Sequence, residues 1–84
     1  MRQEFYNIPI DVVCYFEQNE IRPLRFRLKN EIIKVHKTNG YWAKHEGAVL
    51  YHFFAVSDRL KNYYELQLNA NTLEWHLRKI VDEI

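Results

Sequence analysis

Cysteine, glycine and proline are all scarce in this chain of 84 residues, which has one cysteine, two glycines and two prolines. The single cysteine, Cys14, excludes an intramolecular disulfide, and small domains without disulfides are typical of reducing compartments. So little glycine and proline excludes a linker-like or low-complexity chain. We therefore expect a folded protein, and the cytoplasm is its expected location.

Long apolar runs and an excess of charge of either sign are also missing. Nowhere do about 18 apolar residues follow one another, as a membrane span requires, and the first residues lack the apolar stretch of a signal peptide. Twelve basic and eleven acidic residues give a formal net charge of +1. Such a balance creates no overall field toward nucleic acid or an anionic membrane. We expect no membrane partner, and an electrostatic partner has to be recognised by a local patch.

The chain has instead a series of short runs, from Ile8 to Ile80, in which apolar and polar residues alternate. Alternation with a period of two puts every second side chain on one face of a strand. The pattern predicts an all-β fold with one domain over residues 1–84, since a chain of this length supports a single core. The expected architecture is a small antiparallel barrel or strongly curled sheet of about five to seven strands. The predicted core centres on Phe26, Val35, Phe54, Leu66 and Trp75.

The first part of the chain contains the most regular runs. Residues 8–16 are predicted as a strand in which Cys14 acts as a small buried hydrophobe rather than a nucleophile. Residues 21–37 are predicted as a hairpin with Lys29 and Asn30 at its tip, because Asn tolerates the positive φ that such tips need. The predicted facing pairs are Leu28 with Glu31, Phe26 with Ile33, Leu24 with Val35 and, on the outward face, Arg25 with Lys34.

The middle of the chain is predicted to contain a second tight turn and a covered strand. Asn39-Gly40 is the strongest hairpin dipeptide in the sequence and predicts a turn into a short strand at 41–44. Residues 48–56 are apolar on both faces apart from His52. This composition is typical of a strand with neighbours on both sides.

The C-terminal segment fits two interpretations. Asn71, with Glu74 three residues later and apolar residues at helical spacing, resembles the start of a helix. Alternatively, a four-residue loop after a strand at 63–68 leads into a second strand through about Arg78, and the number of sensible facing pairs favours this reading. Residues 79–84 then form a short helical turn or an apolar tail on a sheet edge. The predicted pairs are Leu68 with Leu73, Leu66 with Trp75, Tyr64 with Leu77 and Glu65 with His76.

Short motifs are spread along nearly the whole chain: Pro9-Ile10, Arg22-Pro23 followed by Phe26, Ile33 to Val35, Tyr41-Trp42, Tyr64-Glu65-Leu66 and Trp75-His76-Leu77. Together they resemble a family of small bacterial all-β proteins of uncharacterised function. They are also similar to the C-terminal segment of the catalytically inactive, Y-family-polymerase-like subunit of bacterial mutagenesis cassettes. The resemblance implies a bacterial protein in a DNA-maintenance setting, and it supplies no catalytic residue.

Residues with catalytic or metal-binding chemistry form no recognisable cluster in the sequence. The histidines lack the close paired spacing that zinc ligands need, so we predict no metal site. Glu65 and Glu74 fit solvated charges on a wet face better than an acid/base pair. We therefore predict no catalytic residue, no cofactor and no enzymatic activity. The four histidines are His36, His45, His52 and His76.

Basic residues on the outward face of the first hairpin form the candidate binding patch: Arg25, Arg27, Lys29 and Lys34, with His36 beside them. Arginine on a sheet can contact phosphates, and a nearby aromatic side chain can stack a base. The outward acidic residues Glu31, Glu65 and Glu74 can neutralise this patch. A solvated basic face is therefore the alternative interpretation.

Strand edges offer a third kind of contact, because an unpaired edge is a template for a strand from another chain. Val13, Tyr15 and Ile32 are predicted to point outward and would add apolar contact area. The sequence therefore predicts a non-enzymatic binding or accessory module that contacts a protein partner, or a second copy of itself, through a sheet edge or outer face. The alternative function is binding of single-stranded nucleic acid.

Overall fold

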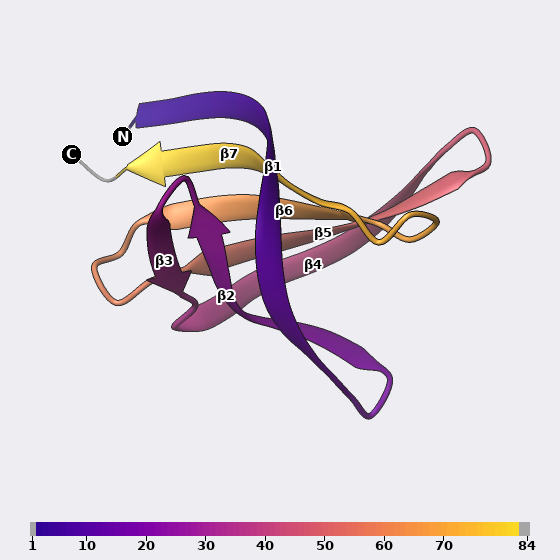
Figure 1. Cartoon of the computed structure of the whole chain (residues 1–84), viewed down its shortest axis with the longest axis horizontal. Coiled ribbons are helices and arrows are strands. Elements are labelled where there is room, and N and C mark those ends of the chain that lie inside the picture. Colours follow the sequence, from indigo (N-terminus) through magenta and orange to yellow (C-terminus); the bar gives the residue numbers. More distant parts are fainter. Residues whose placement is uncertain (1, 83–84) are drawn as a thin grey trace.

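The computed structural model describes residues 2–82, which form seven strands joined in one antiparallel sheet (Figure 1). The strands are β1 (Arg2–Glu17), β2 (Glu20–Leu28), β3 (Glu31–Lys34), β4 (Lys37–Glu46), β5 (Val49–Ser57), β6 (Tyr63–Asn69) and β7 (Trp75–Asp82). Their order across the sheet is β3-β2-β1-β7-β6-β5-β4, so β3 and β4 are its two edges. The prediction of a small, curled, all-β fold is confirmed, and the sheet does not close into a barrel.

The long strand β1 divides the sheet into two layers. Its residues up to Ile10 pair with β7, and from Asp11 onward it pairs with β2. We call the first part of β1 with β7, β6, β5 and β4 the large layer, and the rest of β1 with β2 and β3 the small layer. In Figure 1, β2 and β3 lie across the strands of the large layer. The curled sheet thus folds one of its faces onto itself.

The core lies between the two layers. Phe26 of the small layer meets Tyr64 of β6 edge to face, with ring centroids 5.2 Å apart. The ring centroids of Phe54 and Trp75 are 5.5 Å apart, and Leu66, in the same core cluster, is fully buried. Four of the five predicted core residues are therefore confirmed. Val35 is only half-buried, because it stands at the margin of the core where β3 ends.

The first predicted hairpin forms, with one correction. Arg25 pairs with Lys34 and Phe26 with Ile33, as predicted. The prediction that Leu24 points inward is wrong, since the ladder passes from Arg25 directly to Pro23 opposite β1 and leaves Leu24 as a bulge. Leu24 is 42% exposed, and Pro23 takes the buried position. One extra residue inverts the alternation on its N-terminal side.

The predicted turn at Asn39-Gly40 is wrong. Both residues lie inside β4, where Thr38 pairs with Val56 and Gly40 with Ala55, so that Asn39 forms a bulge. Its side-chain amide donates a hydrogen bond to Ser57 Oγ at 3.1 Å. The actual turn lies between Glu46 and Val49, where Gly47 has a φ of +62°. Neither Asn39 nor Gly40 has the positive φ that a two-residue hairpin turn requires, so here the Asn-Gly pair marks a bulge inside a strand.

The C-terminal segment is a strand, as favoured, but its register differs by two residues. Leu66 pairs with Leu77 and Leu68 with Trp75, so the predicted partners of the β6 residues are wrong. The loop is longer because Asn69 Oδ1 accepts hydrogen bonds from the backbone N–H groups of residues 71 and 72. Leu73 therefore stays in the loop, with a φ of +65°.

The strand interpretation also extends further than predicted. Residues 79–82 continue β7 as a strand, so a helical turn there is wrong, and residues 83–84 lie outside the described residues. Pairing over this longer strand gives Glu65 the partner Lys79. The predicted pair of Glu65 with His76 is therefore wrong, and His76 faces Gln67.

Candidate protein-binding edge and cleft

The two edges of the sheet differ in length, charge and surroundings. β3 has four residues and carries a charge at each end, Glu31 and Lys34. The loop at 58–62 lies beside it, and the two segments line one shallow groove. β4 has ten residues, pairs only with β5, and is uncharged from Thr38 to Ala43. Short, charged and covered edges resist pairing with other chains, so β4 is the edge that remains available.

The loop beside β3 is organised by Asp58. Its carboxylate accepts hydrogen bonds from the backbone N–H groups of Leu60 and Asn62, from the Asn62 side chain and from Tyr64 Oη. Burial alone would raise the pKa of this carboxyl, but the hydrogen bonds to Asn62, Leu60 and Tyr64 outweigh it and lower the pKa below its ordinary value. The ionised carboxylate therefore holds the loop in place next to β3.

Two neighbouring aromatic residues of β4 point to opposite faces of the sheet. Tyr41 lies on the core side, 5.2 Å from the ring of Phe54. Trp42 lies on the outer face and stacks nearly parallel on Phe53 at 5.4 Å. Tyr41 and Trp42 remain 54% and 41% exposed, because no strand lies beyond β4 among the described residues. The free edge therefore carries an aromatic anchor on each face.

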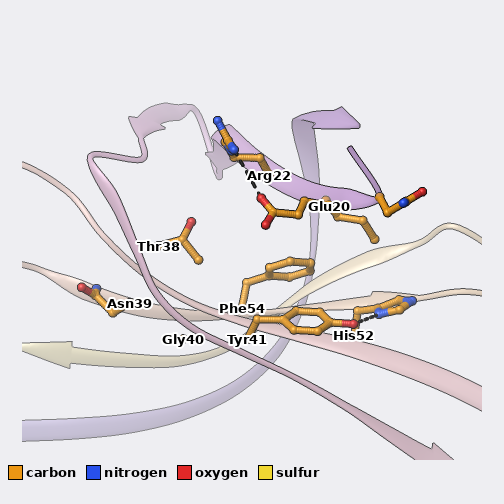
Figure 2. Close-up of a pocket in the computed structure, with 10 residues that line it drawn as sticks. Glu20, Arg22, Thr38, Asn39, Gly40, Tyr41, His52 and Phe54 are labelled. Carbon is orange, nitrogen blue, oxygen red and sulfur yellow. Dashed lines mark hydrogen bonds and ion pairs between the residues drawn. The ribbon is translucent and has the colours of Figure 1, made fainter. Parts of the chain in front are cut away.

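A cleft of about 560 Å³ opens between β2 and β4 (Figure 2). The chain passes from the small layer to the large layer at a corner before β4, where Val35 N–H donates to Leu24 O at 2.9 Å. The next N–H, that of His36, donates to Ser57 O at 2.8 Å in the large layer. From this corner β2 and β4 diverge, so residues 20–22 and 38–41 form the two walls of the cleft.

The floor of the cleft is aromatic, and four polar side chains of its lining pair with one another. Phe54 and Tyr41 form the floor, and Tyr41 Oη lies 2.7 Å from His52 Nδ1. On the opposite wall Arg22 and Glu20 form an ion pair at 3.3 Å (Figure 2). The lining thus offers apolar contact area with little net charge. It suits an uncharged side chain from a bound segment better than an ionic ligand.

The predicted basic patch lies elsewhere, on the outer face of the small layer. Arg25 and Lys34 are directly opposite each other, and Arg27 faces Ile32. Lys29 stands in the turn beyond β2, with a φ of +58°, and His36 lies in the connection to β4. All five residues are exposed, and within residues 2–82 none of them takes part in an ion pair. The structure brings Arg25, Arg27 and Lys34 together and leaves the other two at the ends.

Apolar residues and one acidic residue, Asp11, lie beside these cations. Val13 lies beside Arg25, and Asp11 beside Arg27, across the ladder between β1 and β2. Exposed apolar residues of this outer face, at the positions where the alternation predicted them, are Val13, Tyr15 and Ile32. The face therefore combines unpaired positive charge with apolar area.

The remaining chemistry-bearing residues are dispersed. Within residues 2–82 no three His, Cys, Asp or Glu side chains come close enough to hold a metal ion. Cys14 is half-buried against the core, and burial raises the pKa of its thiol. In the same described part of the chain no helix is long and apolar enough to cross a membrane.

The cleft and the aromatic anchors were not found by sequence reasoning. The prediction of a turn at Asn39-Gly40 divides β4 in two and hides its length. The signal that was present is the uncharged run from Thr38 to Ala43, next to the aromatic pair Tyr41-Trp42. Comparison of the chain with family models, with curated proteins and with solved structures finds no match.

Proposed function

We propose that this protein is a non-enzymatic binding module of the bacterial cytoplasm, which contacts other proteins by taking an extended segment onto the free edge of β4. The observation that carries the proposal is the uninterrupted stretch Gly40–Glu46, which pairs regularly with β5 and has no strand on its other side among the described residues. Every second backbone N–H and C=O of such an edge points outward.

The side chains around this edge support the same mode of contact. In strand addition the main chain supplies affinity, and pockets for alternate side chains supply specificity. A segment on β4 would direct alternate residues toward the aromatic floor of the cleft formed by Tyr41 and Phe54. On its other face it would meet Trp42. Aromatic residues are enriched at protein interfaces, because they bury a large area with little loss of side-chain freedom.

Selection of short random peptides displayed on phage tests this function. Peptides that bind are expected to show apolar residues at alternate positions and to slow hydrogen exchange of β4 amides more than of β3 amides. Failure to select any peptide, or protection confined to another surface, contradicts the proposal.

A pair of proline variants supplies the matched control. Neighbouring residues direct their N–H groups to opposite sides of a strand. Of Ala43→Pro and Lys44→Pro, one therefore removes a hydrogen bond to β5 and lowers stability, whereas the other removes only an outward donor. The variant that keeps its wild-type melting temperature is expected to lose peptide binding. Full binding by that variant would show that the edge is not the site.

The exposed cations of the small layer favour a second candidate function, the binding of single-stranded nucleic acid. Arg25, Arg27 and Lys34 share one face with Tyr15, and backbone phosphates and stacked bases are recognised by such a combination. Labelled oligonucleotides titrated at two salt concentrations test it, since phosphate contacts weaken as salt rises. Arg25→Ala is expected to weaken binding and Lys44→Ala, near the tip of the hairpin of β4 and β5, to leave it unchanged. Absence of binding at low salt contradicts this candidate.

A further inference from the structure

The available stretch of β4 is complementary to itself. Gly40–Glu46 begins after the bulge at Asn39 and ends at the turn, so its central residue is Ala43. When two identical strands pair in antiparallel fashion about a two-fold axis, each contact occurs twice and the axis passes through the centre of the paired stretch. The register that uses the whole stretch therefore sets Ala43 opposite Ala43 of a second copy.

On the outer face, this register places Trp42 opposite Lys44 of the second copy. The aliphatic stem of a lysine covers apolar surface while its ammonium group remains near water, and an ammonium over an indole ring is attracted by the ring. Trp42 is already held by its stack on Phe53, so it presents a fixed surface. Because of the two-fold symmetry, this contact forms twice.

On the cleft side, the same register places Tyr41 opposite His45 of the second copy. Both side chains are exposed on the free hairpin, and their rings can pack across the ladder as aromatic cross-strand pairs do. At the ends of the stretch Gly40 meets Glu46, a pair without a clash or a like charge. Every pair in the stretch is thus compatible.

Neighbouring registers are worse. A shift of one pair toward the turn sets Lys44 opposite Lys44 of the second copy, and like charges directly opposite are destabilising. A shift in the other direction sets Trp42 opposite Trp42 and places His45 opposite the bulge at Asn39, so regular pairing is confined to the shorter stretch Gly40–Lys44. A two-fold axis perpendicular to the sheet has to pass between two copies of the same residue. The register can therefore change only by moving the axis from one residue of β4 to the next. The sequence of β4 therefore specifies one register.

The shape of the molecule leaves room for this contact. The ladder between β5 and β6 ends at Tyr51 and Asn69, so only the tip of the hairpin of β4 and β5, beyond Lys44 and Tyr51, projects past β6, whereas Gly40–Ala43 lie beside the part of β5 that pairs with β6. Figure 1 shows this hairpin extending away from the layers, opposite the end where β3 meets β4. Because β4 is the last strand of the large layer, a second copy can lie beside it on the side away from β5.

We infer that the occupant of the β4 edge is a second copy of this chain, paired antiparallel through Gly40–Glu46 about a two-fold axis at Ala43. This inference rests on the proposed function and names its partner. It joins the two large layers into one continuous sheet. The paired stretch is short, so the interface is small and the dimer is expected to form at micromolar rather than nanomolar concentration.

A cysteine placed on the axis tests the register. In Cys14→Ser/Ala43→Cys, the two thiols of a dimer face each other at a Cβ separation of about 4.5–5.5 Å, close to the range of a cross-strand disulfide. Mild oxidation is expected to yield mostly a covalent dimer. Cys14→Ser/Thr38→Cys, on the same strand but outside the stretch, is the matched control and is expected to stay mostly monomeric. Equal cross-linking of both variants would overturn the register.

Light scattering on the wild-type protein tests the dimer without any substitution. The average mass is expected to rise toward twice that of one chain between about 1 µM and about 1 mM. Trp42→Ala is expected to weaken the dimer about tenfold, as the loss of a central aromatic contact does. A wild-type protein that stays monomeric over this range, with no cross-link at residue 43, overturns the inference. If selected peptides still bind the β4 edge in that case, the proposed function stands and only its partner is different.

Discussion

The two edges of this sheet belong to one ladder of strands, yet they are protected to very different degrees. β3 is four residues long, is charged at both ends and has the loop at 58–62 beside it. β4 is ten residues long, and its uncharged middle carries two exposed aromatic residues beside an open cleft. Natural sheets usually protect both edges. The contrast indicates that the exposure of β4 serves a contact, while β3 is kept unreactive.

The largest expected effect comes from removing the anchor of the small layer. Phe26→Ala deletes the ring that packs against Tyr64 and leaves a cavity between the layers, at a cost of about 3–5 kcal/mol in the free energy of unfolding. Denaturant unfolding measures this cost, and Leu60→Ala, at an exposed loop position, is the control with a change below about 0.5 kcal/mol. A small effect of Phe26→Ala would mean that this ring does not hold the small layer on the core.

A smaller effect is expected at the loop that flanks β3. Asp58→Asn weakens the hydrogen bonds to Asn62, Leu60 and Tyr64 and is expected to lower the free energy of unfolding by about 1–2 kcal/mol at neutral pH. Hydrogen exchange at β3 amides should become faster in this variant while exchange at β4 amides stays unchanged.

The same carboxylate gives this effect a defined pH dependence. The pKa of Asp58 is lowered in the folded state. Its stabilisation is therefore present in full above the pKa of the unfolded chain and is lost as the pH falls through the folded pKa. The difference in stability between wild type and Asp58→Asn should shrink in this acidic window. A difference that stays constant down to strongly acidic pH would contradict the role of the ionised carboxylate.

Making β4 resemble β3 is expected to change binding to other chains more than the free energy of unfolding. Trp42→Lys places a charge in the uncharged middle of the edge and removes the stack on Phe53, which costs about 0.5–1.5 kcal/mol. Self-association and peptide binding should both be strongly reduced, as measured by light scattering and by titration. Unchanged association would show that the charge pattern of β4 does not determine its availability.

The smallest effect is expected from the reverse change. Glu31→Thr/Lys34→Val removes the charges of β3 but leaves its length and the neighbouring loop as they are. The average mass in light scattering should remain that of the wild type at equal concentration. New association by this variant would show that charge alone protects β3.

The sequence was sufficient to predict the fold wherever the alternation runs without interruption. The ladder from Arg25 to Leu28 with β3 follows directly from the pattern, and so does the inward face of β6. The prediction fails where one inserted residue inverts the pattern, as at Leu24 and Asn39. It fails again where Asn69 organises a longer loop and shifts the register by two. Such local hydrogen bonding leaves no trace in a pattern of apolar residues.

The candidate site could not be predicted for a different reason. Which strand lies at an edge depends on the order of all strands, and that order is set by the pairing of β1 with β7. The alternation of a single run does not show whether the run has one neighbour or two. Arg25, Arg27 and Lys34 were recognisable as an outward face because they occupy one hairpin. The cleft needs β2 and β4, which are brought together only by the complete fold.

The pairing of β1 with β7 also has a consequence for how the chain folds. Ile10 is opposite Trp75, and Arg78 Nε donates to the backbone oxygen of Tyr6, so nearly the whole sequence separates the partners. Closing so long a loop costs entropy before any of these contacts can repay it. Strands β1, β2 and β3 can form early from local contacts, and so can strands β4, β5, β6 and β7. The pairing of β1 with β7 then forms last. The β4 edge would then be assembled, and open to other chains, before the core between the layers is sealed.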